Sequence, residues 1–225
     1  MVSAVLTAVA AAAVPVHRET IGRSVRGRAI VAVAVGQPSA TTKVLVVGCI
    51  HGNEGAGIAI ALRLERMTPP KDVQLWIVPD LNPDGHAANT RQNAHGVDLN
   101  RNWPSDWRRH RGGLFDSGPR PLSEPETQAA RRLILRIHPD VSIWYHQHQR
   151  LVDESGGEVS VERRYAQLVG LPARRLRPLL PGTAVRWENA RIRGSTAFVV
   201  ELPAGRLSSA AVARYARAVR AISSD

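Results

Sequence analysis

The sequence predicts an α/β fold, a single domain built as a three-layer α/β/α sandwich around a mixed, mostly parallel central sheet. Two observations support this fold class. Short runs of apolar and β-branched residues, each bounded by glycine, proline or polar turns, alternate along the chain with segments of helical periodicity. The length of 225 residues is within the range of one domain with a sizeable core, and the chain shows no internal repeat or linker.

The first predicted elements lead to a buried strand. Residues 21–29 are rich in glycine and arginine and predict turns, whereas residues 30–35 alternate larger and smaller apolar side chains and predict the first strand. The run Val-Leu-Val-Val-Gly-Cys-Ile at residues 44–50 predicts a fully buried second strand. Residues 58–64 predict the helix that follows, which the next Pro-Pro pair ends.

The rest of the chain continues this alternation with two irregular interruptions. Residues 81–123 are rich in Asn, Gly, Pro, Asp and Arg and show little periodicity, and a loop of this length in a compact domain is usually functional. Residues 172–193 are also irregular, and they are rich in arginine. Around these two segments the sequence predicts strands at residues 73–78, 141–146 and 196–202 and helices at residues 125–137, 161–171 and 208–222.

The composition is that of an ordinary globular protein with an excess of arginine. The formal net charge is +11, and lysine occurs only at Lys43 and Lys71. A basic chain can bind nucleic acid, an acidic cell surface or an anionic substrate. Because no basic stripe is interleaved with aromatic residues, we do not expect a nucleic-acid partner. The single cysteine, Cys49, excludes a disulfide framework and a cysteine zinc site, and its place in a buried strand makes it a small core residue.

Residues 1–14 resemble the remnant of a secretory signal peptide. An uncharged run rich in alanine and valine ends in small residues before Pro15, although the basic segment that normally precedes such a run is missing. The run is too short to cross a bilayer, so we expect no membrane span. We therefore predict a secreted or cell-envelope protein. The alternative is an N-terminal extension without a targeting role, on a cytoplasmic protein.

His51 and Glu54 stand where a metal site is expected. His51 follows the buried strand, Gly52 and Asn53 turn the chain, and Glu54 begins the next helical segment. Open α/β sheets place their functional sites at such carboxyl ends of strands. An imidazole and a carboxylate at this spacing can bind one divalent ion, and zinc accepts both ligand types. The alternative is structural: His51 caps a turn, and Glu54 favours the N-terminus of a helix.

A catalytic zinc site takes a third protein ligand, and another strand end supplies one. The predicted strand at residues 141–146 ends in Trp-Tyr-His-Gln-His, so that His146 and His148 are both candidates. Residues two apart on an extended segment face the same side, so either histidine could reach the metal. We prefer His146 because it directly follows the apolar run, which leaves His148 as a structural or surface residue.

A series of motifs in a fixed order gives a more specific indication. After His-Gly-Asn-Glu come Asn-Pro-Asp-Gly at residues 82–85, Asp-Leu-Asn-Arg-Asn-Trp at residues 98–103 and Ser-Glu-Pro-Glu-Thr at residues 123–127. A histidine that closes a strand and then Phe-Val-Val-Glu at residues 198–201 complete the series. This series resembles the zinc metallocarboxypeptidase family, and within that family it resembles the compact bacterial murein peptide amidase-like branch. Residues 15–225 would then form a zinc carboxypeptidase-like catalytic domain.

The resemblance implies that His51, Glu54 and His146 hold one Zn2+ per chain. Two imidazoles and one carboxylate leave a fourth position for water, and zinc lowers the pKa of such a water to about 7. The resemblance also implies that Glu201 is the general base, which takes the proton of this water and passes it to the leaving amine. The alternative for Glu201 is a structural carboxylate paired with a cation.

The same resemblance implies substrate contacts for three more residues. Arg91 would bind the substrate and stabilise the oxyanion beside the zinc, while Asn100 and Arg101 would hold the terminal carboxylate of the substrate. A planar guanidinium binds a carboxylate through two hydrogen bonds, and a neighbouring amide completes the contact. Only a residue with a free carboxylate would then be placed correctly at the metal. The alternative for any one arginine in so basic a chain is a solvated surface charge.

The sequence departs from the digestive members of the family in one respect. Those enzymes carry a mobile tyrosine in the segment before the catalytic glutamate, whereas residues 181–194 contain no tyrosine. This difference favours the short bacterial branch. Arg186, Glu188 and Arg193 in the same segment either line a specificity pocket or face the solvent.

Three functions are compatible with these residues. The first is a zinc metallocarboxypeptidase that hydrolyses a C-terminal peptide or amide bond by means of a zinc-activated water, with the γ-D-glutamyl–diaminopimelate bond of murein peptides as a possible target. The second is a zinc deacylase of small N-acyl amino acids, similar to aspartoacylase and succinylglutamate desuccinylase, which share two of the motifs. The third is a non-catalytic module that binds acidic wall polymers. We prefer the first because the Asn-Pro-Asp-Gly and Ser-Glu-Pro-Glu-Thr segments are present and the site is complete, and we expect a monomer.

Overall fold

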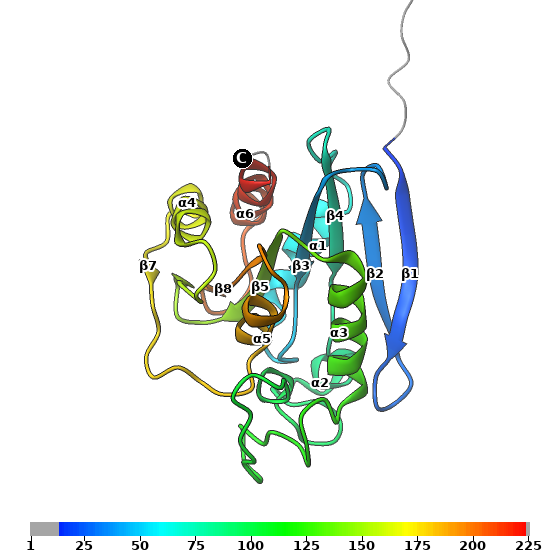
Figure 1. Cartoon of the computed structure of the whole chain (residues 1–225), viewed down its shortest axis with the longest axis vertical. Coiled ribbons are helices and arrows are strands. Elements are labelled where there is room, and N and C mark those ends of the chain that lie inside the picture. Colours follow the sequence, from blue (N-terminus) through cyan, green and yellow to red (C-terminus); the bar gives the residue numbers. More distant parts are fainter. Residues whose placement is uncertain (1–13, 224–225) are drawn as a thin grey trace, which may run out of the picture.

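The computed structural model describes residues 14–223, so the predicted signal-like segment lies outside the described residues apart from Val14. A sheet of eight strands in the order β1-β2-β4-β3-β5-β8-β6-β7 runs through the molecule, and helices lie on both of its faces (Figure 1). The strands are β1 (Val16–Arg23), β2 (Ala29–Val35), β3 (Thr42–Val47), β4 (Val73–Val78), β5 (Val141–Gln147), β6 (Leu151–Asp153), β7 (Ala173–Arg174) and β8 (Thr196–Leu202). The helices are α1 (Ala56–Leu64), α2 (Pro83–Ala88), the 3-10 helix η1 (Leu99–Arg101), α3 (Pro125–Ile137), α4 (Val159–Val169), α5 (Ala184–Arg191) and α6 (Ser209–Ile222).

The centre of the sheet is parallel, and most of its outer pairings are antiparallel. Strands β4, β3, β5 and β8 pair in parallel, in that order. Strand β1 joins β2, β2 joins β4 and β6 joins β8 in antiparallel fashion, and the short β7 extends β6 in parallel. Helices cover both faces of the central strands, which explains why these strands are continuously apolar. The predicted α/β sandwich with a mixed sheet is confirmed.

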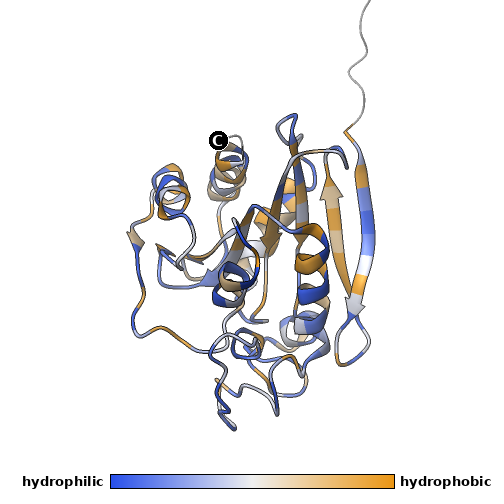
Figure 2. Ribbon diagram, in the orientation of Figure 1, coloured by the Kyte–Doolittle hydropathy of each residue, from blue (hydrophilic) through white to orange (hydrophobic). Residues whose placement is uncertain are grey.

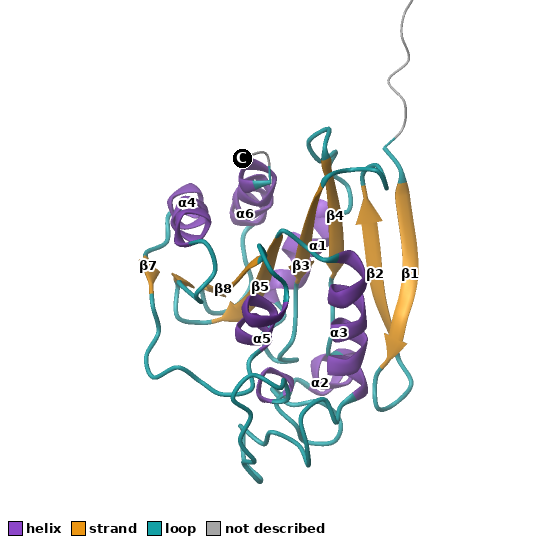
Figure 3. Cartoon of the chain, viewed as in Figure 1, coloured by secondary structure: helices purple, strands orange, loops and turns teal. Residues whose placement is uncertain are grey.

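Two hydrophobic cores lie on the two faces of the sheet. Helices α1, α4 and α6 cover one face, and α3 and α5 cover the other (Figure 3). Successive residues of β3 point into opposite cores, as a period of two requires: Val44 and Val46 pack with α1 and α6, and Leu45 and Val47 pack with α3 and α5. Strand β3 is therefore fixed from both sides, and its carboxyl end is a rigid place for a ligand.

The edge strand β1 differs from the central strands because solvent covers its outer side. Figure 2 shows hydrophilic residues in the middle of β1, whereas the neighbouring β2 is more hydrophobic. Charged contacts help to hold the edge: Arg18 lies 2.5 Å from Glu65, just beyond α1, and Glu19 pairs with Arg136 of α3. Because these charged side chains interrupt any apolar pattern, the sequence did not predict this strand.

Most predicted boundaries lie within two residues of the observed ones, but the strand predicted at residues 44–50 is β3 at Thr42–Val47, so Cys49 follows the strand. The predicted strands at residues 73–78 and 196–202 and the predicted helix at residues 125–137 have the observed bounds. Three predictions are wrong in part. Residues 21–29 contain the end of β1 as well as a turn, residues 81–123 contain α2 and η1, and residues 172–193 contain β7 and α5. Within residues 14–223, no helix is long and apolar enough to cross a bilayer.

Two glycines after β3, Gly48 and Gly57, have no room for a side chain. A Cβ atom on Gly57, at the start of α1, would lie 2.3 Å from the carbonyl oxygen of Gly48 and 2.5 Å from the Cβ of Tyr145. Since such distances are far below van der Waals contact, these glycines let α1 begin directly against the ends of β3 and β5. The loop between Gly48 and Gly57, which carries His51 and Glu54, is thereby held against the sheet.

Candidate metal centre and active site

The ligand atoms of His51, Glu54 and His146 converge at the carboxyl ends of β3 and β5. The Nδ1 atom of His51 lies 3.0 Å from Glu54 Oε2 and 3.1 Å from His146 Nδ1. His146 Nδ1 lies 3.2 Å from the same Glu54 oxygen. All three side chains are buried, and together they form a group that can hold a metal ion.

This donor set fits one zinc ion. Ligand atoms bonded to tetrahedral zinc at about 2.0–2.1 Å are about 3.3 Å apart, which is close to the three spacings in the cluster. Burial opposes the charge of Glu54, but hydrogen bonds from His146 and His51 outweigh it and hold the pKa of Glu54 well below its usual range. Burial also lowers the pKa of His51, but Asp98 and Glu54 outweigh burial and raise it. The cluster therefore stabilises positive charge at its centre.

Asp98 orients His51 from the side opposite the metal position. Its Oδ1 lies 3.0 Å from His51 Nε2, so the imidazole proton is placed on Nε2 and the Nδ1 lone pair is available to a metal. Burial opposes the charge of Asp98, but His51 and Arg91 hold its pKa well below the usual range. The sequence did not predict a role for Asp98, because only Asn100 and Arg101 of the Asp-Leu-Asn-Arg motif were expected to act, as substrate ligands. A carboxylate within that motif was the signal that could have identified it.

We expect Asp98→Asn to weaken zinc binding by about 10- to 100-fold, because an amide can still accept the His51 hydrogen bond but carries no charge. Competition with a chromogenic chelator at neutral pH measures this affinity. Asp72→Asn is a suitable control because Asp72 is exposed and lies before β4, away from the cluster. Equal zinc affinities of the two variants would show that Asp98 does not support the site.

Arg91 connects the metal cluster to Asp98. Its Nε donates to Asp98 Oδ2 at 2.9 Å, and its Nη1 donates to Glu54 Oε1 at 2.8 Å. The other oxygen of each carboxylate contacts a histidine. Both oxygens of Glu54 and both oxygens of Asp98 are therefore held. The guanidinium also lines the cavity beside the cluster.

Asn100 and Arg101 lie side by side in η1, and both are buried. The Oδ1 of Asn100 accepts a hydrogen bond from the backbone N–H of Ala184 at 3.0 Å. This bond fixes the orientation of the amide, so that its NH2 group points away from Ala184. Arg101 Nη1 donates to the carbonyl oxygen of Asn100 at 2.7 Å. The Phe115 ring lies 5.5 Å from Arg101 Cζ and 5.3 Å from Arg91 Cζ, so one ring contacts both guanidinium groups.

Glu201 lies on β8 directly opposite His146 of β5 in the parallel pair. Its oxygens accept long hydrogen bonds from Gln149, at 3.3 Å from the backbone and 3.4 Å from the side chain. Within residues 14–223 the structure gives Glu201 no ion pair with an arginine or lysine. The paired structural carboxylate, which was the alternative interpretation of Glu201, therefore does not describe this side chain.

A cavity of about 770 Å³ brings the predicted residues together. All seven predicted site residues line it: His51, Glu54, Arg91, Asn100, Arg101, His146 and Glu201. His148 is exposed, is absent from the cavity lining and is not part of the metal cluster. The structure thus favours His146 over His148 as the third ligand.

The Asn-Pro-Asp-Gly motif supports the loop that carries His51 and Glu54. Asn82 caps α2, where its Oδ1 accepts from Gly85 N at 3.0 Å, and its Nδ2 donates to Ile50 O at 3.2 Å. A Cβ on Gly52 would lie 2.0 Å from the carbonyl carbon of Gly85, so α2 and the ligand loop are in direct backbone contact. This motif acts on the metal site through packing.

The Ser-Glu-Pro-Glu-Thr motif supports the chain after Arg101 in a similar way. Thr127 Oγ1 donates to Asn102 Oδ1 at 2.7 Å, and Asn102 Nδ2 donates to Ser123 Oγ at 2.9 Å. The amide of Asn102 is buried, and it connects the start of α3 to the end of η1. The position of Arg101 is therefore tied to α3.

The three tyrosines do not enter the cavity. Tyr145, Tyr165 and Tyr215 are buried in the core under α1, α4 and α6, and the Tyr145 and Tyr165 hydroxyl groups lie 2.6 Å apart. None of the three is in a position to take the role of the mobile tyrosine of digestive enzymes.

The candidates for a specificity pocket before β8 have three different positions. Arg186 lines the cavity and pairs with Asp106. Glu188 is fully buried beside Ser142 and Trp144, and burial raises its pKa to about 7. Arg193 is exposed and does not line the cavity. Only Arg186 is therefore in a position to contact a substrate, whereas Arg193 faces the solvent, which was the other alternative, and Glu188 does neither.

The sequence and the structure of this chain are similar to those of known proteins. The model of the zinc carboxypeptidase family matches residues 3–155. Murein peptide amidase A of Escherichia coli K12 is 32% identical over 147 residues, an alignment that covers 60% of this chain and 60% of that protein. The alignment therefore spans less than two thirds of the length of this relative.

Solved structures agree in fold. The crystal structure of a murein-tripeptide amidase from Escherichia coli O157 has a TM-score of 0.74 and 27% sequence identity, and the match covers 92% of this chain and 93% of the other. Carboxypeptidase A from Helicoverpa armigera has a TM-score of 0.77 at 18% identity, covering 93% of this chain and 70% of the other, which is a likeness of fold. With a family match over more than half of its length and a buried His-Glu-His cluster suited to one zinc ion, the chain belongs to the zinc carboxypeptidase family.

Proposed function

We propose that this protein is a zinc-dependent hydrolase that cleaves a C-terminal peptide or amide bond, and that its substrates are murein peptides cleaved at the γ-D-glutamyl–diaminopimelate bond. The observation that carries the proposal is that three metal-binding side chains, the carboxylate of Glu201 and an Asn-Arg pair line one cavity. When zinc is bound, it lowers the pKa of a water molecule to about 7 and polarises a carbonyl group.

In this proposal, Glu201 holds and moves the proton. It accepts a proton from the attacking water and later donates it to the leaving amine. The contacts of Glu201 suit this task, because Gln149 donates two long hydrogen bonds and no arginine or lysine of the described part of the chain forms an ion pair with the carboxylate. Its place opposite His146 on the neighbouring strand brings it to the same end of the sheet as the metal ligands.

Asn100 and Arg101 bind the terminal carboxylate of the substrate in the proposed mechanism. The Asn100 amide is held by the Ala184 backbone, and Arg101 is held by the Asn100 carbonyl and the Phe115 ring. Because both donors are fixed before the substrate arrives, little conformational entropy is lost on binding. Arg91, which is fixed by Asp98 and Glu54, stabilises the charge that develops on the carbonyl oxygen.

The substrate class rests on the relatives and on the charge of the cavity. Both amidase relatives from Escherichia coli are named for murein substrates, and one of them aligns over more than nine tenths of both chains. The cavity contains five arginines against three carboxylates, Glu54, Asp153 and Glu201, which favours an anionic substrate. Among the other candidate functions, the non-catalytic wall-binding module is disfavoured because the metal cluster, the carboxylate and the Asn-Arg pair are all present.

The test is a digest of defined peptides with the zinc-loaded enzyme, followed by mass spectrometry. We expect release of diaminopimelate from L-alanyl-γ-D-glutamyl-diaminopimelate, and we expect a chelator to stop the reaction and added zinc to restore it. An N-acyl amino acid in a parallel reaction tests the deacylase alternative. Cleavage of the N-acyl amino acid alone would contradict the proposed function.

A further inference from the structure

Two arginines in the cavity take no part in the proposed mechanism. Arg108 and Arg109 line the cavity, and both side chains are exposed. Within residues 14–223 the structure gives neither guanidinium group a hydrogen bond, an ion pair or a ring contact. Ten donor groups thus face a space that also holds the metal cluster, although the chain has 19 acidic residues that could have paired with them.

The other arginines of the cavity have partners. Arg91 is bound by Glu54 and Asp98. Arg186 pairs with Asp106 and donates to the carbonyl oxygen of Leu180 at 3.2 Å. Arg101 contacts the Asn100 carbonyl and the Phe115 ring and is the proposed carboxylate ligand. Arg108 and Arg109 are therefore the cavity arginines whose guanidinium groups have no partner among the described residues.

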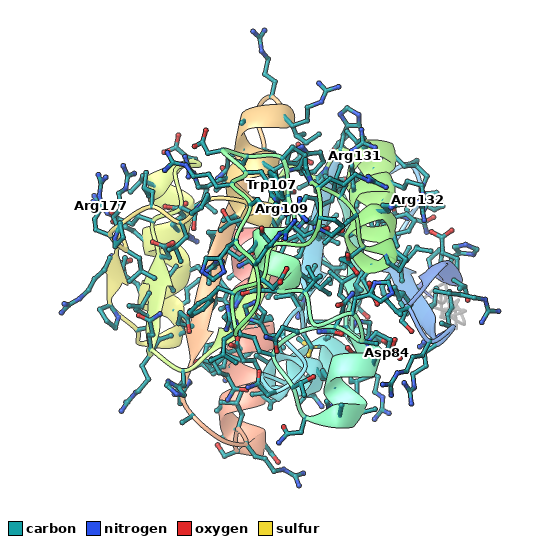
Figure 4. All side chains as sticks on the ribbon, turned by 90° about the horizontal axis from the view of Figure 1, so that it is seen from below. Asp84, Trp107, Arg109, Arg131, Arg132 and Arg177 are labelled. Atoms are coloured by element: carbon teal, nitrogen blue, oxygen red, sulfur yellow. The ribbon has the colours of Figure 1, made fainter. Side chains whose placement is uncertain are left out.

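The loop that carries this pair is held in place by Ser117. Ser117 is buried, its Oγ accepts from His110 N at 2.8 Å, and the same Oγ donates to the Arg108 carbonyl at 3.0 Å. Its carbonyl oxygen accepts from Trp107 Nε1 at 3.2 Å. In Figure 4, Arg109 and Trp107 lie toward the centre of the face, whereas Arg177 lies at its edge. The backbone on both sides of the two arginines is thus fixed over the cavity.

We infer that Arg108 and Arg109 form a second anion subsite, which binds a carboxylate of the substrate other than the one held by Asn100 and Arg101. Two guanidinium groups that have no partner among the described residues can bind a carboxylate through charge-assisted hydrogen bonds. This inference rests on the proposed function, whose substrate offers two further acids. A γ-linkage leaves the α-carboxylate of the glutamyl residue free, and diaminopimelate carries a second carboxylate at the end of its side chain.

Three peptides distinguish the two sources of the carboxylate. The first is L-alanyl-γ-D-glutamyl-diaminopimelate; in the second the glutamyl α-carboxylate is an amide, and in the third the side-chain carboxylate of diaminopimelate is an amide. We expect the wild-type enzyme to prefer the first peptide over one of the amides by about tenfold in kcat/KM, because a charge-assisted hydrogen bond of 1.4 kcal/mol or more corresponds to at least that factor. We expect Arg108→Gln combined with Arg109→Gln to remove this preference, mainly through KM.

Arg111→Gln is the matched control. Arg111 is an exposed arginine on the same loop, but it does not line the cavity, so this variant is expected to keep the preference. Calorimetric binding of the three peptides to the Glu201→Gln variant, with and without the two further substitutions, gives a readout that needs no hydrolysis. There too we expect the pair of substitutions to weaken binding of the unmodified peptide by about tenfold.

The outcomes separate this inference from the proposed function. Equal kcat/KM values for all three peptides, or a preference that survives in the double variant or is lost in Arg111→Gln, would overturn the second anion subsite and leave the hydrolase proposal intact. If no peptide is hydrolysed, the proposed function fails, and the binding measurement still decides. Equal affinities for the peptide and both amides would then refute the subsite, and an affinity difference that depends on Arg108 and Arg109 would support it.

Discussion

Replacing Glu201 by glutamine is expected to reduce hydrolysis by about 100- to 10,000-fold, the contribution typical of a general acid–base group. Glutamine has nearly the same shape and can still accept one of the two hydrogen bonds from Gln149, but it cannot take a proton from water. Because Glu201 is not a member of the metal cluster, the zinc content of the variant is expected to stay at one per chain. Initial rates with murein tripeptide and zinc analysis of the same preparation measure both effects.

Glu19→Gln serves as the control for Glu201→Gln. Glu19 lies on the edge strand β1 and pairs with Arg136, far from the cavity lining, so its loss removes one surface ion pair. We expect full activity in this variant. Retained turnover in Glu201→Gln would remove Glu201 as the base, and loss of zinc would assign it to the metal site instead.

His146→Ala is expected to lower zinc affinity by more than about 100-fold, since a lost ligand has a larger effect than the 10- to 100-fold of a lost partner behind the ligand. Its Nδ1 faces both His51 Nδ1 and Glu54 Oε2, and removal of the ring leaves two protein ligands where catalytic zinc takes three. Hydrolysis is expected to disappear with the metal. Zinc affinity by chelator competition and activity at saturating zinc measure the two losses.

His148→Ala is the matched control, two residues further along the chain. Its side chain is exposed and does not line the cavity, so zinc affinity and activity are expected to stay at the wild-type level. The reverse result, with zinc lost in His148→Ala and kept in His146→Ala, would move the ligand to His148. A thermal unfolding curve of each variant separates loss of a ligand from loss of the fold.

The elements that were predicted with correct bounds have strong local signals. Strands β4 and β8 are apolar runs between turn residues, and α3 begins with a proline at its first position and an acidic first turn. These patterns follow from burial on both faces or from helix capping, and both are visible in a single segment. Local chemistry was therefore sufficient for the centre of the fold.

The missed elements depend on partners far along the chain. Strand β1 is exposed and charged, and it exists because β2 offers a free edge. Helix α5 buries Trp187 and Glu188 on a surface with little amphipathic pattern, and its buried carboxylate is accommodated by Ser142 and Trp144 of β5. A sequence pattern does not contain these tertiary contacts, which override weak local propensity.

The candidate site shows the same division. The seven predicted residues stand in motifs at strand ends or in the long loop, and the structure brings all of them into one cavity. The role of Asp98 depends on which side of His51 it faces, and the exposure of Arg108 and Arg109 to the cavity depends on the path of the loop around Ser117. Both depend on three-dimensional side-chain placement, which spacing along the sequence does not determine.

The metal cluster also has a consequence for biogenesis. His51 and His146 are 95 residues apart. His51 follows β3, and His146 is the last residue but one of the neighbouring strand β5. A nascent chain that has not yet paired these strands possesses no complete coordination sphere, so metal uptake follows assembly of the central sheet. An ion that binds the native chain but not the unfolded one shifts the equilibrium towards the native state by mass action. Zinc scarcity during synthesis would therefore reduce the amount of folded protein as well as its activity.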